Sequence, residues 1–280
     1  MSIKALWCNS RYLTNDCFSY RGDIYLPNHA ASVMATFSAL VSERVLPTDI
    51  IWKTLVHALG ALWRCRILRD PNVKRDARRV IAVEARILAH ILDIMQTLYQ
   101  IGRVQLADAS SSPEPSVNGT PLATGETQTD LAQSITAVFR RSLPALRIGS
   151  KWLTVHFSYV SEATSRLGSE TGVDVPSILS EFWASYSTFA TLLGKTFPID
   201  KLPKLTQPLE EDVEIRGFAP LKQAMVNPSG STVNGLEPGQ SLVHPNEEQL
   251  MRIADLLQDA IKISEFVVSL YHFLSHILDY

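Results

Sequence analysis

The chain has 280 residues, of which 46% are hydrophobic and 19% are charged, and its net charge is -2. This composition is typical of a globular protein of one or two domains, and it excludes binding to nucleic acid or membranes through overall charge. Cys8, Cys17 and Cys65 form neither a disulfide framework nor a paired metal spacing, which favours a reducing compartment. The sequence contains no signal-peptide core and no run of the roughly 20 apolar residues that a membrane helix needs, so we expect a soluble intracellular protein.

Most of the chain carries helical patterns, in which apolar residues recur every three or four positions. The spacing predicts helices at about 29–45, 48–69, 73–104, 130–142, 174–194 and from 246 to the end. A further helix is expected to begin at Pro144 with Ser142 as its cap, because proline suits a first turn better than a helix interior. The short connection at Asp70-Pro71 predicts that the helices beside it are antiparallel neighbours. The expected fold class is all-α, built from antiparallel helical hairpins.

The predicted helical-hairpin domain covers 29–280 and follows an irregular N-terminal segment at 1–28. Two stretches interrupt this domain. Residues 106–128 include thirteen Ser, Thr, Pro, Gly or Asn and no aromatic residue. They cannot bury enough apolar surface to offset the entropy of ordering, so they are predicted to be a disordered linker. Glycines and prolines at 226–244 predict a flexible loop.

Residues 209–221, which we name the strap, interrupt the helical pattern. Three prolines, Pro203, Pro208 and Pro220, disfavour helix around it, and Val213 and Ile215 alternate with acids, which predicts extended backbone. The residues expected to act as its apolar anchors are Leu209, Val213, Ile215, Phe218 and Leu221. Gly217 is available for a bend with positive φ. The density of apolar residues favours an ordered, non-helical segment laid across helices. The residues expected to hold it in place are Leu209, Asp212, Ile215, Gly217, Phe218, Pro220 and Leu221.

Residues 64–86, which we name the basic segment, carry eight arginines or lysines against three acids. One interpretation is the solvated outer face of ordinary helices. A second is a surface that binds the phosphates of nucleic acid or of a phosphopeptide. A third is internal pairing with the acids of the strap, Glu210, Glu211, Asp212 and Glu214. The candidate nucleic-acid or phosphate-binding residues are Arg64, Arg66, Lys74, Arg75, Arg78, Arg79 and Arg86.

The sequence carries no recognisable catalytic motif. It has no glycine-rich phosphate loop, no Gly-x-Ser-x-Gly elbow and no acid cluster placed for metal-dependent nuclease chemistry. His272 and His276 have the i, i+4 spacing of a zinc-binding pair, but no further ligand accompanies them, so we interpret them as core or interface residues. We therefore expect no enzymatic activity, no metal and no cofactor. Aromatic core anchors are predicted at Trp52, Trp63, Trp152 and Trp183.

The strap also carries a family resemblance. It reads LEEDVEIRGFAPL and resembles the L-P-E-D-x-E-L-x-G-F-x-P-L segment of the DNA/RNA-binding domain shared by Est1-type telomerase proteins and nonsense-mediated mRNA decay adaptors, with Glu210 in place of the usual proline. Residues 143–146 with Trp152-Leu153 resemble the segment that opens a helix in the middle of that domain. Residues 55–62 resemble an earlier helical stretch more weakly. The similarity spans about 30–265 and is closest to fungal versions.

This resemblance implies a helical-hairpin domain that works as a non-enzymatic adaptor in mRNA decay or telomere maintenance, in the nucleus, the cytoplasm or both. Its partners would be proteins of an mRNA-decay or telomerase complex. The alternative is a module that binds RNA or single-stranded DNA directly through the basic segment. The family's upstream tetratricopeptide-like phosphopeptide module and its nuclease domain have no counterpart among the predicted elements. We therefore expect neither phosphopeptide binding by such a module nor RNA cleavage.

Overall fold

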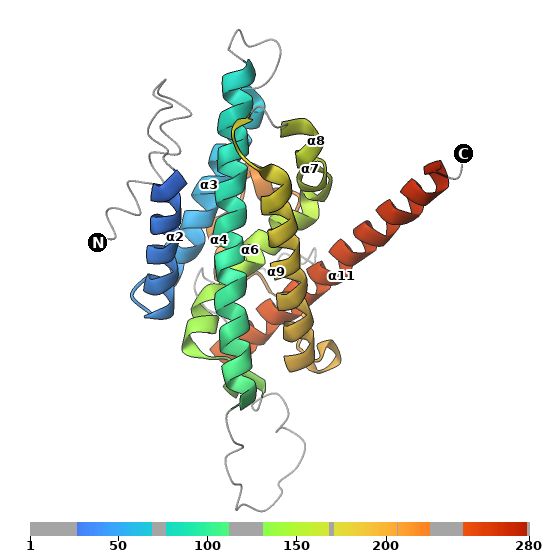
Figure 1. The fold of residues 1–280 in the computed structure, drawn as a ribbon. Coiled ribbons are helices and arrows are strands. Elements are labelled where there is room, and N and C mark those ends of the chain that lie inside the picture. The colour runs from blue at the N-terminus through green and yellow to red at the C-terminus, as the bar shows by residue number, and fades with distance from the viewer. Residues whose placement is uncertain are drawn as a thin grey trace, which may run out of the picture. The chain divides into compact units, whose positions relative to one another are not determined.

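The computed structural model describes residues 27–68, 77–111, 131–167, 171–205, 207–224 and 243–278. These residues form helices and short connections and contain no β-strand, which confirms the all-α prediction. Figure 1 labels the longer helices along the chain. The longer helices are α2 (Pro27–Ser42), α3 (Thr48–Leu68), α4 (Ala77–Ser111), α6 (Ala137–Val155), α9 (Val175–Thr196) and α11 (Pro245–Leu278). The short ones are α7 (Phe157–Ser161), α8 (Ala163–Leu167), η2 (Ile199–Lys201), α10 (Glu210–Glu214) and η3 (Ala219–Leu221).

The chain divides into two compact units. Unit 1 comprises Met1–Gly102 and Ser158–Phe189, and unit 2 comprises Arg103–Phe157 and Ala190–Tyr280. The helices α4 and α9 contribute residues to both units.

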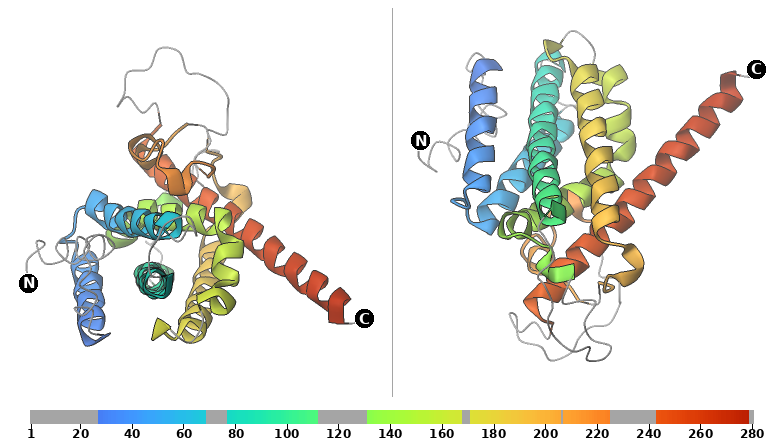
Figure 2. Two further views of the ribbon diagram at one scale, coloured as in Figure 1. Left: turned by 90° about the horizontal axis from the view of Figure 1, so that it is seen from above. Right: turned by 60° about the horizontal axis from the view of Figure 1, so that its bottom comes forward.

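Unit 1 is built around the N-terminal part of α4. Its sequence predicted an apolar stripe, and the structure buries that stripe at Ile87, Ile91, Ile94, Leu98 and Ile101. In two views, α4 runs between α2 on one side and α9 on the other (Figures 1 and 2). An aromatic cluster joins α4 to α9, in which the ring of Tyr99 lies 5.8, 5.5 and 5.1 Å from the rings of Phe182, Tyr186 and Phe189.

Unit 2 is built around α6, which packs against α11 and η3. The predicted break at Pro144 was wrong, because α6 continues through this proline and is capped by Thr136 rather than Ser142. The hydroxyl of Thr136 accepts a hydrogen bond from the backbone N–H of Phe139 at 3.2 Å. Every residue from Ser142 to Leu153 is buried, and this packing outweighs the lost hydrogen bond of one proline.

The structure changes the predicted boundary of the linker at 106–128. Helix α4 continues to Ser111, because Leu106 extends its apolar face and is fully buried, so a linker beginning at 106 was wrong. The predicted linker residues 112–128, most of the loop at 226–244 and most of the segment at 1–28 lie outside the described residues. Of the predicted aromatic anchors, Trp52 and Trp152 are buried, whereas Trp63 and Trp183 are half-buried.

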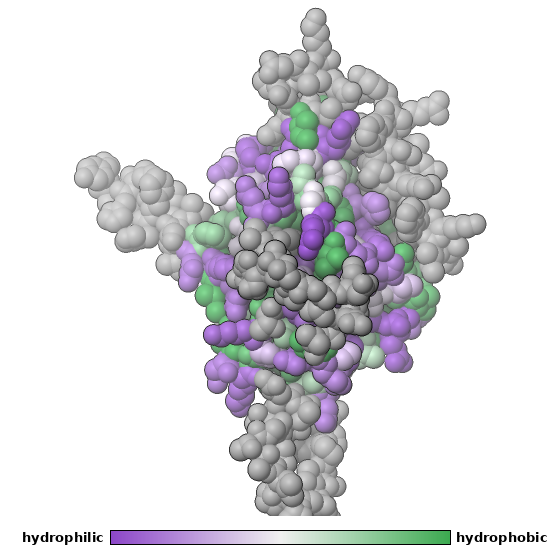
Figure 3. Space-filling model, turned by 180° about the vertical axis from the view of Figure 1, so that it is seen from behind, coloured by the Kyte–Doolittle hydropathy of each residue, from purple (hydrophilic) through white to green (hydrophobic). Residues whose placement is uncertain are grey.

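Large apolar side chains on the described surface are scattered rather than gathered on one element. Figure 3 shows one face, on which hydrophobic residues are interspersed with hydrophilic ones. None of the described helices holds an apolar stretch long enough to cross a lipid bilayer. The exposed large hydrophobic residues are Val45, Ile67, Val104, Ile199, Val213, Ile261 and Phe266.

Candidate functional site

The strap is ordered but not extended throughout. Residues 210–214 form the single turn α10 and residues 219–221 form η3, so the prediction of non-helical backbone was wrong at these positions. Asp212 explains the first turn, because its carboxylate reaches back and accepts the backbone N–H of Leu209 at 2.9 Å. The acids at the start of α10 also suit the positive end of its dipole. Pro220 lies near the start of η3, where a missing N–H breaks no bond.

This turn reverses the inward and outward positions that an extended strap would have. Val213 was expected to act as an apolar anchor, but its side chain is 51% exposed. Glu211, which an extended strand would turn outward, is only 1% exposed. A helical turn places residues three and four apart on one face, so Glu211 and Ile215 are buried together. Leu209, Ile215, Pro220 and Leu221 are also buried, and Phe218 is half-buried.

Gly217 makes the predicted bend with φ of +82°, and a Cβ at this position would meet no other atom within 4 Å. Replacing Gly217 by alanine should therefore destabilise the protein by about 1–2 kcal/mol through backbone strain alone. Gly194 in α9 is the matched control, because its Cβ would make an ordinary 3.6 Å contact with Leu257. Gly194→Ala should stabilise by about 0.5–1 kcal/mol, since alanine is the better helix former. Urea denaturation of both variants measures the two changes in stability. Equal changes would contradict the role of Gly217 as a residue that needs positive φ.

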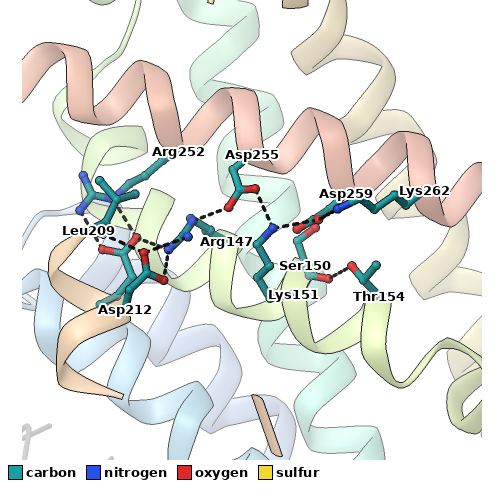
Figure 4. A network of polar contacts seen from close by, with 11 residues as sticks. Arg147, Ser150, Lys151, Thr154, Leu209, Asp212, Arg252, Asp255, Asp259 and Lys262 are labelled. Atoms are coloured by element: carbon teal, nitrogen blue, oxygen red, sulfur yellow. Dashed lines mark hydrogen bonds and ion pairs between the residues drawn. The ribbon is translucent and has the colours of Figure 1, made fainter. Parts of the chain in front are cut away.

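Arg147 of α6 is the centre of a buried charge network in unit 2 (Figure 4). Its side chain is 2% exposed and its guanidinium contacts three carboxylates. Nη1 and Nη2 donate to the two oxygens of Asp212 at 2.8 and 3.1 Å. Nη1 also donates to Glu211 at 3.2 Å, and Nε donates to Asp255 of α11 at 2.7 Å. One side chain of α6 thus holds both α10 and α11.

Two further bases complete the charge network. Arg252 of α11 makes a bidentate pair with Glu211, in which Nε and Nη2 donate at 3.0 and 2.8 Å. Lys151, one turn after Arg147, donates to Asp255 at 2.6 Å and to Asp259 at 3.0 Å. Lys262 lies at the solvent-exposed end of the network, with Nζ 3.6 Å from Asp259. The network therefore consists of Arg147, Lys151, Glu211, Asp212, Arg252, Asp255 and Asp259.

The acids of the charge network differ in their electrostatic environment. Burial alone would raise the pKa of Glu211, but hydrogen bonds from Arg252 and the charges of Arg252 and Arg147 hold it below the ordinary value. Burial likewise opposes ionisation of Asp255, and the charges of Arg147 and Lys151 outweigh it, so this pKa is also lowered. The pKa of Asp259 is raised, because burial dominates and Asp255 repels its charge. Its Oδ2 atom has no hydrogen-bond partner within the described residues.

These directions predict opposite results for two similar substitutions. Asp255 is stabilised as an anion, so Asp255→Asn should cost about 2–3 kcal/mol at pH 7 and leave Nε of Arg147 without its charged partner. Ionised Asp259 is disfavoured, so Asp259→Asn should change the stability by less than about 1 kcal/mol. Urea denaturation at pH 7 measures both variants.

The pH dependence gives a second readout for the same pair. The contributions of Glu211 and Asp255 are present above the carboxyl pKa of the unfolded chain and are lost as the pH falls through their lowered values. Asp259 has a raised pKa, so its protonation opposes this loss. Stability should therefore fall more steeply with acidification in Asp259→Asn than in the unaltered protein. A shallower fall of stability in Asp259→Asn would contradict the raised pKa of Asp259.

Two acids of the strap form ion pairs with arginines other than those of the basic segment. Glu211 and Asp212 were proposed to pair with the basic segment, but they pair with Arg147 and Arg252 instead. Sequence reasoning missed the bases of the charge network. A signal was present, because Arg147 and Lys151, like Asp255 and Asp259, are spaced i, i+4 among apolar residues.

The structure describes only part of the basic segment. Arg64 of α3 is exposed, and Arg66 and Arg86 are half-buried. Arg78 and Arg79 lie in the first turn of α4, but their side chains are outside the described residues, as are Lys74 and Arg75. The individual roles predicted for these bases therefore stay predictions.

One contact within unit 1 was not predicted. The guanidinium of Arg66 lies over the ring of Tyr159 in α7, with Cζ 4.2 Å from the ring centroid. The hydroxyl of Tyr159 donates to Glu84 of α4 at 2.8 Å, and Glu84 is fully buried. Burial and the negative charge of Glu84 raise the pKa of the Tyr159 hydroxyl. An acid within the apolar stripe of α4 was the sequence signal for this contact.

The structure does not test the interpretation of the two histidines with zinc-binding spacing. His272 and His276 lie in α11, but their side chains are outside the described residues. Within the described residues, no three His, Cys, Asp or Glu side chains are grouped so that they could hold a metal ion.

The family model of the Est1 DNA/RNA binding domain matches residues 3–225. The chain belongs to this family. The match includes the basic segment, α6 and the strap, and it confirms the resemblance seen in the strap sequence. No match was found among curated proteins or among solved structures. Helix α11 follows the matched range, yet it supplies Arg252, Asp255 and Asp259 to the charge network of this Est1-type domain.

Proposed function

We propose that this Est1-type chain is a non-enzymatic module that binds RNA or single-stranded DNA directly through the basic segment. The observation that carries the proposal is the match to a DNA/RNA binding domain, which includes all of residues 64–86. Exposed Arg64 and half-buried Arg66 and Arg86 supply the positive charge that phosphate binding needs. Glu211 and Asp212 do not neutralise these bases, because their ion pairs are with Arg147 and Arg252.

A titration against salt tests this proposal. Fluorescence anisotropy with labelled single-stranded RNA and DNA should show affinity that falls linearly on logarithmic axes, with a slope of about -0.7 for each phosphate contacted. The variant Arg64→Glu/Arg78→Glu/Arg79→Glu should lose most of this affinity. Lys201→Glu/Lys204→Glu/Lys222→Glu is the control, because it makes the same charge change at three exposed lysines outside the segment. Absence of binding at low salt, or equal losses in the two variants, would refute the proposal.

The second candidate function is a protein adaptor in mRNA decay or telomere maintenance. The likeness of the strap to that of mRNA-decay adaptors favours it, together with the exposed Ile261 and Phe266 of α11. Tagged protein isolated from cells should then retain subunits of an mRNA-decay or telomerase complex after ribonuclease and deoxyribonuclease treatment. Loss of these subunits after the treatment would leave direct nucleic-acid binding as the explanation.

The absence of enzymatic activity is part of the proposal. Each acid of the charge network is paired with arginine or lysine. Glu211 and Asp255 have lowered pKa values because arginine and lysine stabilise their anions, so they are weak general bases. Ribonuclease assays of the purified protein should therefore show no cleavage, whereas cleavage abolished by one substitution in the network would refute this part.

A further inference from the structure

Two arginines that are distant in sequence meet at one aromatic ring in unit 1. Arg66 of α3 and Arg166 of α8 have their guanidinium carbons 4.2 and 4.6 Å from the centroid of the Tyr159 ring. Cations over an aromatic face are attracted by its negative charge distribution. The ring therefore holds two positive charges, one of which lies outside the basic segment.

The ring that positions these guanidinium groups is itself held in place. Tyr159 is 5% exposed, and its hydroxyl donates to Glu84, which is fully buried. Arg166 also donates from Nη2 to the backbone carbonyl of Tyr159, and its Nε lies 3.8 Å from the exposed carboxylate of Glu162. The contacts join α3, α4, α7 and α8, so the arginines lose less conformational entropy on binding a ligand than free surface side chains would.

Both arginines retain capacity for an anion. Arg66 is half-buried, and no carboxylate of the described residues pairs with it. The Arg166 side chain is 31% exposed, and among the residues that the structure describes its carboxylate contact is the long one to Glu162. A guanidinium that stacks on an aromatic ring still has N–H donors that point outward in its own plane. These donors can bind phosphate oxygens.

We propose that Arg66 and Arg166, positioned by the ring of Tyr159, form a preorganised phosphate site for the backbone of single-stranded nucleic acid. This inference rests on the proposed function and extends its surface to α7 and α8. Arg66 and Arg166 contact the phosphodiester, and Tyr159 is a positioning residue that fixes both guanidinium groups. The site recognises phosphate and not the base, so it adds affinity without sequence preference.

The test compares single-stranded RNA binding by Arg66→Gln, Arg166→Gln and the double variant with binding by Arg216→Gln. Arg216 is an exposed arginine of the strap and controls for the loss of one positive charge. Arg66→Gln and Arg166→Gln should each weaken binding by about three- to tenfold at moderate salt and reduce the salt slope by about 0.7. Arg216→Gln should change neither quantity. Circular dichroism should show that all four variants remain folded.

Substitutions of Tyr159 test its positioning role. Tyr159→Phe keeps the ring and should retain the affinity, whereas Tyr159→Leu keeps both arginines but should weaken binding. If the wild-type protein binds RNA but the Arg66 and Arg166 variants lose no more affinity than Arg216→Gln, the phosphate site is wrong and the proposed function still holds. Absence of wild-type binding at low salt would overturn both. If Tyr159→Leu does not fold, the salt slopes of the arginine variants still decide the proposal.

Discussion

Replacing Arg147 by methionine is expected to destabilise the protein by about 3–5 kcal/mol. Methionine fills much of the same volume but leaves Glu211, Asp212 and Asp255 without the guanidinium that contacts all three. Uncompensated charges in a buried site cost far more than the loss of an exposed ion pair. Urea denaturation followed by circular dichroism measures the change.

Arg140→Met is the matched control for this experiment. Arg140 lies in the same helix, is half-buried, and donates to the neutral side chain of Asn246 at 2.8 Å. Its replacement should cost no more than about 1.5 kcal/mol. Adding Asp212→Asn to Arg147→Met should recover part of the lost stability, because it removes one unpaired charge. Equal effects of Arg140→Met and Arg147→Met would show that the charge network does not hold unit 2 together.

Removal of α11, by ending the chain at His244, is expected to abolish the cooperative folding of unit 2. Helix α11 buries Leu250, Met251, Ile253, Leu256 and Ile263, each of which contributes about 1.5–3 kcal/mol. The deletion also leaves Lys151 without Asp255 and Asp259, and it leaves Glu211 without Arg252. Together these losses are as large as the about 5–15 kcal/mol by which folded domains are stable. Near-ultraviolet circular dichroism and a thermal melt would detect the loss.

A chain that ends at Val267 is the control for this deletion. It keeps the α11 side chains that the structure places in the core and in the charge network. We expect this shorter chain to keep the cooperative unfolding transition that the chain ending at His244 loses. A stable, cooperatively folded chain ending at His244 would contradict this prediction and would show that the core around α6 does not need α11.

Much of the helical architecture could be predicted from the sequence. The apolar stripe of α4 recurs every three or four residues, and its burial at Ile87, Ile91 and Leu98 follows directly. The strap sequence also predicted membership of the Est1 family, which the family match confirms. The positive φ at Gly217 was predictable as well, because glycine adopts this backbone conformation without steric cost.

Local rules failed where burial outweighed them. Pro144 and the prolines around the strap argued against helix, yet α6 continues through Pro144 and α10 forms within the strap. One proline costs about 3 kcal/mol in a helix interior, and the burial of Ser142 to Leu153 around it offsets that cost. The strap forms a turn because Asp212 accepts the backbone N–H of Leu209. Asp212 and Glu211 of this turn also pair with the buried side chains of Arg147 and Arg252.

The sequence by itself determined most of the helices, the bend at Gly217 and the family, because these depend on residue spacing and on the conformational limits of single residues. Only the tertiary structure decided which charges are paired. Arg147 and Asp255 are far apart in sequence, and their 2.7 Å contact depends on the packing of α6 against α11. The same holds for Arg66, Tyr159 and Glu84, which three different helices bring together. A buried charge is tolerated only beside its partner, and the partner is selected by packing rather than by position in the chain.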